Sequence, residues 1–307
     1  MLRTRIGPSL SLANPVMSAS GTFGAGIEGA GFSPLARVGA LVSKTVTVAP
    51  RPGNPPPRLA ETPAGMLNSI GLENRGADDF LAEKLPRMRA LGPKVVVNIG
   101  GESVGEFVEL AGRFAAAGVD ALEVNLSCPN VQQGRLLFST APAQTEAVLR
   151  EIKAVTPPGV PVLAKLSPNV TDVTEIARAA EAGGADGITA INTLIGMAVD
   201  WRRRRPVLGC GIGGLSGPAI KPVALRMVWA IARAVSIPVV GVGGIRTAED
   251  ALEFLVAGAA AVQVGTANFV DPAAMVGLLD ELERLVAEQG TTVEELCGSC
   301  AAEAARS

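Results

Sequence analysis

Residues 117–130 read AGVDALEVNLSCPN, and this stretch contains the unit on which the whole chain is built. Gly118 has the position of a helix C-terminus, where glycine readily adopts the left-handed conformation that ends a helix. The apolar run at 121–127 that follows is typical of a parallel strand covered on both faces. Polar residues follow the run directly. The stretch therefore predicts a helix end, a buried strand and a functional loop, in that order.

The same unit recurs along the chain. Capping signals for the intervening helices stand at Ser103-x-x-Glu106 and Asp172-x-x-Glu175. Eight units in 307 residues, with no linker between them, predict a single (β/α)₈ TIM barrel domain over residues 1–307. A doubly wound sheet is the alternative, but it would normally need fewer strands and a glycine-rich turn after the first. The seven further strands are expected at 15–21, 40–46, 95–101, 162–168, 187–193, 238–244 and 261–267.

Composition excludes several classes of function. The chain has 27 Lys and Arg against 29 Asp and Glu, so its net charge of −2 gives no electrostatic case for nucleic acid or an anionic membrane. It has no His and no Tyr, which excludes catalytic triads, Cys-His dyads and histidine metal sites. Four cysteines make no disulfide framework. Without a signal-like start or a membrane-length apolar run, we expect a cytoplasmic protein.

Polar residues gather where the predicted strands end. A polar side chain there costs stability unless it is hydrogen-bonded, so eight such ends favour one shared ligand in the barrel mouth. Gly243-Gly244 and Gly265-Thr266 follow the last two strands, where barrels usually bind phosphate, although tight turns alone would also need glycine. Lys44 and Lys165 are expected to face this ligand. Cys128 is expected on a loop above the barrel.

Two connections are longer than a β/α unit requires. Residues 47–94 contain the proline-rich segment 49–58, and residues 194–237 contain the run Arg202–Arg205. Long connections after strand C-termini are usually lids or binding loops. Cys297 and Cys300 form a C-x-x-C pair that supplies only two ligands, so we expect no metal site. No role is assigned to Cys210.

Together these motifs resemble the catalytic subunit of dihydroorotate dehydrogenase, class 1B, over nearly the whole chain. NLSCPN (125–130) is shared with related flavin barrels, whereas RPGNPPPR (51–58), MLNSIGL (66–72) and GGLSGPAIKP (213–222) are strongly specific in this order. Further matching segments are NPVMSASGTFG (14–24), SKTVT (43–47), AKLSPNVTD (164–172), INTLIGMA (191–198), GVGGI (241–245) and VQVGTANF (262–269).

The resemblance implies that FMN is bound at the C-terminal face of the barrel and that (S)-dihydroorotate is oxidised to orotate. Cys128 would be the base that takes the C5 proton, and Lys165 would support negative charge on the reduced flavin. FMN contacts are implied for Ser20, Lys44, Thr45, Asn98, Asn125, Lys165, Ile191, Gly217, Gly243, Gly244, Gly265 and Thr266. Contacts with the carboxylate and ring amides of orotate are implied for Lys44, Asn68, Ser69, Ile70, Gly71, Leu72, Asn125, Asn192 and Thr193.

The resemblance also implies a partner. Class 1B relatives transfer electrons to NAD through an iron–sulfur flavoprotein subunit with FAD and a [2Fe–2S] cluster, in a heterotetramer. This chain has neither a dinucleotide fingerprint nor four suitably spaced cysteines, so both cofactors are expected on the partner. Three alternatives stay open: a dihydropyrimidine dehydrogenase-type barrel, a fumarate-using class 1A enzyme, and a non-catalytic barrel that binds a phosphate ligand.

Overall fold

Eight parallel strands close into a barrel in which every strand pairs with the next one along the chain and the last pairs with the first. The structure is a computed structural model and describes residues 1–127 and 141–300. Each of the eight predicted strands is present, which confirms the (β/α)₈ fold. The barrel strands are β3 (Val16–Ser18), β4 (Ala40–Val42), β7 (Lys94–Ile99), β8 (Ala121–Asn125), β9 (Val162–Leu166), β10 (Gly187–Ala190), β15 (Val239–Val242) and β16 (Ala259–Val264).

A short antiparallel ribbon closes the N-terminal end of the barrel. Its strands β1 (Thr4–Ile6) and β2 (Leu10–Leu12) bring three apolar side chains against the inward-facing residues of the barrel. Ser9 Oγ donates a hydrogen bond of 3.1 Å to the carbonyl oxygen of Gly159, just before β9 begins. The lower part of the barrel interior is therefore apolar and sealed, so a polar ligand has access only at the opposite end.

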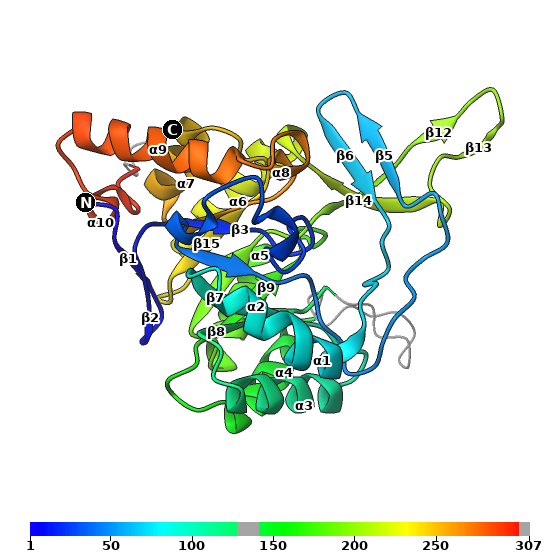
Figure 1. Ribbon diagram of the computed structural model, residues 1–307, viewed down its shortest axis with the longest axis horizontal. Helices are drawn as coiled ribbons and strands as arrows, with labels where there is room; N and C mark the ends of the chain where they lie inside the picture. The colour runs from blue at the N-terminus through cyan, green and yellow to red at the C-terminus, as the bar shows by residue number, and fades with distance from the viewer. Residues whose placement is uncertain (128–140, 301–307) are drawn as a thin grey trace.

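Helices cover the outside of the barrel (Figure 1). Their starts follow the capping rules: the Ser103 hydroxyl accepts from Glu106 N at 3.3 Å, and Thr247 forms a complete capping box with Asp250. Asp172 caps Thr174 N at 2.8 Å instead of pairing with Glu175. The barrel-covering helices are α3 (Val104–Ala116), α4 (Pro142–Val155), α5 (Val173–Ala182), α6 (Lys221–Ala232), α7 (Ala248–Ala257) and α9 (Ala274–Glu288), with α1 (Gly76–Asp79), α2 (Leu85–Arg89), α8 (Ala267–Val270) and α10 (Val293–Leu296) as shorter pieces.

The two long connections are not irregular loops, because together they build a second sheet. It is antiparallel, with the order β11-β14-β6-β5, and it extends to one side of the barrel (Figure 1). Leu215 pairs with both Leu67 and Leu194, and this contact joins the two connections. The arginine run lies on the small hairpin β12–β13 beyond it. The bounds are β5 (Leu59–Thr62), β6 (Gly65–Asn68), β11 (Leu194–Met197), β12 (Val199–Asp200), β13 (Arg205–Pro206) and β14 (Ile212–Ser216).

Among the helices formed by residues 1–127 and 141–300, none is long and apolar enough to cross a membrane.

The ribbon under the barrel should contribute strongly to stability. Leu10 is 1 % exposed, so Leu10→Ala leaves a cavity and should lower the free energy of unfolding by ~2–5 kcal/mol. Urea unfolding followed by circular dichroism measures this change. Leu59→Ala is the matched control, because Leu59 is 50 % exposed and its truncation should change stability by less than ~1 kcal/mol. Equal losses in the two variants would show that the ribbon does not close the core.

Candidate functional site

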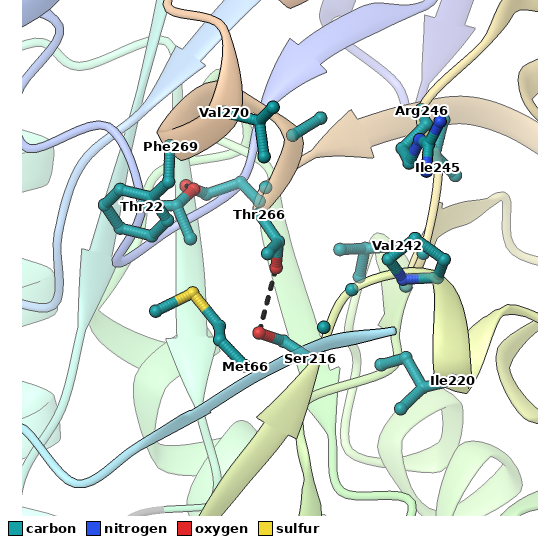
Figure 2. Close-up of a pocket in the computed structure, with 18 of the residues that line it drawn as sticks. Thr22, Met66, Ser216, Ile220, Val242, Ile245, Arg246, Thr266, Phe269 and Val270 are labelled. Atoms are coloured by element: carbon teal, nitrogen blue, oxygen red, sulfur yellow. Dashed lines mark hydrogen bonds between the residues drawn. The ribbon is translucent and has the colours of Figure 1, made fainter. Parts of the chain in front are cut away.

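A cavity of about 800 Å³ lies at the C-terminal ends of the barrel strands. Figure 2 shows Thr266 and Ser216 facing each other in it, joined by a hydrogen bond of 2.9 Å between their hydroxyl groups. Met66 and Phe269 lie to one side of this pair and Ile245 to the other (Figure 2). The second sheet thus forms part of the wall, in direct contact with the loop after β16. The lining segments include 19–20, 61–66, 191–193, 216–218, 242–246 and 265–271.

Close packing dictates the glycines on this wall. Gly243 and Gly244 have φ of +137° and +78°, and a Cβ on Gly244 would lie 2.7 Å from the Cβ of Lys221. Only glycine therefore lets the end of β15 pack against the start of α6. Because both glycines also line the cavity, the turn presents bare backbone to whatever binds there. Packing and ligand binding thus require glycine at the same positions.

Asp250 fixes the loop after β15. Its Oδ2 accepts hydrogen bonds from the backbone N–H groups of Arg246 at 2.8 Å and Thr247 at 3.0 Å. The other oxygen pairs with the Lys221 ammonium, which also contacts Glu253 at 2.9 Å. Burial opposes ionisation of Asp250, but the hydrogen bonds from Lys221 and the two amides outweigh it and lower the pKa of this carboxyl. The glycine turn is consequently held in one conformation.

A buried polar network in the barrel interior reaches the cavity through Lys165. Lys165 reaches it from β9, is 5 % exposed, and lies 3.4 Å from the Glu123 carboxylate on β8. Glu123 is fully buried and also accepts from Asn98 Nδ2 at 2.7 Å and from Gln263 Nε2 at 2.6 Å. The amide oxygens of Asn98 and Gln263 are buried and have no hydrogen-bond partner within residues 1–127 and 141–300. Buried acceptors without a protein partner usually accept a hydrogen bond from a ligand or an ordered water.

Glu123 and Gln263 were missed by the sequence interpretation, which considered only the ends of strands. The signal was present, because each is a charged or amide side chain in the middle of an otherwise apolar strand. Such a residue is rarely buried unless it is paired. Lys165 lies 42 residues after Glu123 in the chain, and Gln263 lies 140 residues after it. Only the closed barrel therefore shows that these side chains meet.

A second polar cluster lies above β8. Asn125 Nδ2 donates to Thr45 Oγ1 at 3.4 Å, and Asn125 Oδ1 accepts from Asn192 Nδ2 at 3.2 Å. The same oxygen accepts from the backbone N–H of Ser127 at 3.3 Å. Asn125 thus connects the loops after β4, β8 and β10. The cluster has the donors and acceptors needed to hold a flat polar ring.

Lys44 follows β4 and is half-buried. Burial lowers its pKa below the ordinary value of 10.5, and the nearby carboxylates of Glu73 and Glu28 offset this shift only in part. The ammonium group is therefore incompletely compensated by the protein. An anionic ligand beside Lys44 would relieve that penalty.

The structure brings one part of the predicted site together around the cavity and leaves another part outside its lining. Cys128 lies outside the described residues. The predicted residues that line the cavity are Ser20, Lys165, Ile191, Asn192, Thr193, Gly217, Gly243, Gly244, Gly265 and Thr266. Those outside its lining are Lys44, Thr45, Asn68, Ser69, Ile70, Gly71, Leu72, Asn98 and Asn125.

The predicted substrate segment 68–72 is ordered by its own contacts. Asn68 Nδ2 donates to the carbonyl oxygen of Gly214 at 3.1 Å, which ties the segment to β14. Asn54, from the proline-rich segment, donates to Ser69 Oγ at 2.9 Å. The proline-rich segment therefore supports 68–72 directly. In the described part of the chain, no cluster of three Cys, Asp or Glu could hold a metal ion.

Comparison with known proteins agrees with this geometry. The sequence model described as dihydroorotate dehydrogenase matches residues 1–286. A protein of Desulforudis audaxviator is 53 % identical over 292 residues, which cover 94 % of each chain. A protein of Trichlorobacter lovleyi is 54 % identical over 283 residues, which cover 92 % of each chain. Both are named dihydroorotate dehydrogenase B (NAD(+)), catalytic subunit. With the barrel, the cavity at its mouth and a match over nearly its full length, the chain belongs to the dihydroorotate dehydrogenase family.

Proposed function

We propose that this chain is the catalytic subunit of a class 1B dihydroorotate dehydrogenase, a single barrel domain over residues 1–307 that acts in the cytoplasm. It oxidises (S)-dihydroorotate to orotate in de novo pyrimidine biosynthesis. The observation that carries the proposal is the position of Lys165, which lies at the floor of a cavity whose wall is a glycine turn. The names of relatives that are about half identical to this chain support the same activity.

The cavity fits FMN. Its volume of about 800 Å³ lies within the range of ~300–1,000 Å³ that is usual for ligand sites. The glycine turns that line the cavity suit the phosphate. When bound, FMN would accept the hydride from C6 of dihydroorotate at its N5. The residues proposed to hold it are Ser20, Lys44, Thr45, Asn98, Asn125, Lys165, Ile191, Gly217, Gly243, Gly244, Gly265 and Thr266.

Cys128 is the proposed proton acceptor for C5 of the substrate. The chain has no histidine, so a thiolate is the strongest base that the active-site loop offers. Asn125 fixes the approach to this loop, because its side chain accepts from the backbone N–H of Ser127. Lys165 places a positive charge where negative charge develops in the cavity. It does so without solvent screening, since it is 5 % exposed.

The substrate carboxylate is the proposed partner of Lys44, whose half-buried ammonium lacks full compensation. The amides of Asn125 and Asn192 are already hydrogen-bonded to each other and would contact the ring. This carboxylate distinguishes dihydroorotate from the substrates of dihydropyrimidine dehydrogenase-type barrels. The full proposed substrate set is Lys44, Asn68, Ser69, Ile70, Gly71, Leu72, Asn125, Asn192 and Thr193.

Electrons then leave the chain for a second subunit. The relatives are each named as a catalytic subunit with NAD(+), which supports a separate partner and NAD⁺ as final acceptor. We propose that this partner is an iron–sulfur flavoprotein with FAD and a [2Fe–2S] cluster, and that two copies of each subunit form a heterotetramer. The same names favour class 1B over the fumarate-using class 1A.

Electron transfer gives the first test of this function. The purified chain loaded with FMN should lose its flavin absorbance on anaerobic addition of dihydroorotate, and should not reduce NAD⁺ until the partner is added. Stopped-flow absorbance and an NADH assay measure the two steps. Robust NAD⁺ reduction by the single chain would contradict class 1B, and fumarate turnover would indicate class 1A. Faster reduction by dihydrouracil than by dihydroorotate would indicate the dihydropyrimidine dehydrogenase alternative.

Removal of the proposed base should separate binding from chemistry. Cys128→Ala should retain FMN and bind orotate, but its flavin should be reduced ~10²–10⁴-fold more slowly by dihydroorotate, the usual contribution of a general base. Orotate binding is followed by the change in the flavin spectrum. Cys210→Ala is the control, since this exposed cysteine has no proposed role. Near-normal reduction in Cys128→Ala would rule out the assignment.

The position of the phosphate can be tested at Thr266. Thr266→Asp places a carboxylate beside the proposed phosphate and should weaken FMN binding ~10-fold or more by charge repulsion. Riboflavin, which lacks the phosphate, should bind almost equally to Thr266→Asp and to Thr266→Asn, the neutral control of the same shape. Thr266 makes no side-chain cap on α8, so neither substitution removes a helix cap. Equal losses for FMN and riboflavin would place the phosphate elsewhere.

A further inference from the structure

Glu123 is the most deeply buried charge of the barrel interior. It stands in the middle of β8 and its side chain has no exposed surface. Transfer of a carboxylate out of water is expensive unless charged and polar partners replace the lost hydration. A position that served only packing would be filled by an apolar residue, as it is at Val96, Ala121 and Leu163 in the layer below.

The contacts of Glu123 extend across the barrel. Two partners, Asn98 and Lys165, come from the adjacent strands β7 and β9, whereas Gln263 comes from β16, which is not a neighbour of β8. Oε1 accepts from Asn98 and Lys165, and Oε2 accepts from Gln263. Both carboxylate oxygens are therefore held in place by amide donors from opposite sides of the barrel.

The direction of these hydrogen bonds is fixed by chemistry. An ionised carboxylate can only accept, so the NH₂ groups of Asn98 and Gln263 must face Glu123. Among residues 1–127 and 141–300, the charged partner of this carboxylate is the Lys165 ammonium at 3.4 Å. The two amides therefore hold Glu123, and Glu123 in turn holds Lys165, the lysine that lines the cavity.

We infer that Glu123 is a positioning residue for the reaction: held by Asn98 and Gln263, it keeps the Lys165 ammonium in place at the floor of the ligand cavity. The inference rests on the proposed function, in which Lys165 contacts FMN. Glu123 itself acts only through Lys165. Its removal should therefore have no effect of its own once Lys165 has been replaced.

A double-mutant cycle tests this dependence. Glu123→Gln keeps the size of the side chain but removes the charge that holds Lys165. It should raise the FMN dissociation constant and lower the rate of flavin reduction by dihydroorotate, each by about 10- to 100-fold, the range for a lost hydrogen bond to a charged group. In a Lys165→Gln background, the same substitution should change both quantities less than about threefold.

Two controls separate positioning from simple loss of stability. Val96→Ala trims the apolar layer beneath the network and should lower the melting temperature without a change in FMN affinity. The double variant has no unpaired buried charge. If Glu123→Gln is too unstable to purify, the double variant is therefore compared directly with Lys165→Gln. A further tenfold loss in that comparison would overturn the inference, as would additive effects in the cycle or unchanged FMN affinity in folded Glu123→Gln.

The FMN dissociation constant is measured without substrate, by quenching of flavin fluorescence in the apoprotein. A chain that binds FMN but does not oxidise dihydroorotate would refute the proposed function. The FMN dissociation constants of the double-mutant cycle could still be compared. Conversely, normal turnover with additive substitutions at Glu123 and Lys165 would refute the inference alone.

Discussion

Alternation along eight strands in a closed barrel is the constraint on which the rest of the structure depends. Successive side chains of a strand point to opposite faces, and closure turns one face of every strand into a common interior. The lower layer of that interior is apolar, and Met17, Leu163 and Val240 pack together there. Polar side chains are possible in the next layer toward the C-terminal ends of the strands, because they can hydrogen-bond to one another there. The same rule thus produces both a sealed base and a polar floor.

The wall of the cavity has a different origin. The second sheet is assembled from two connections that are well separated in the chain, and Leu215 joins them by pairing with Leu67 and Leu194. In another part of the wall, Asp250 fixes the glycine turn through backbone N–H groups. The floor belongs to the barrel, whereas the wall combines the ends of barrel strands with a sheet specific to these connections. The second sheet therefore supplies part of the cavity wall that the barrel itself does not.

Much of this arrangement could be predicted from the sequence. All eight barrel strands and the N-cap of α3 follow from local patterns of apolar, glycine and capping residues. The second sheet could not be predicted, because its strands are short and β6 and β14 contain glycine instead of an alternating apolar pattern. The hydrogen-bond partners of Glu123 could not be predicted for another reason. The sequence of one strand indicates that a carboxylate is buried, but not which residues face it.

Closure of the barrel also has a consequence for biosynthesis. β3 at residues 16–18 pairs on one side with β16, whose last residue is Val264. During translation, therefore, the first barrel strand keeps an unpaired edge until nearly the whole chain has left the ribosome. Open edges of apolar strands are sites of unwanted association, and pairings between distant segments form slowly. The architecture that shapes the ligand cavity thus leaves the nascent chain exposed for most of its synthesis.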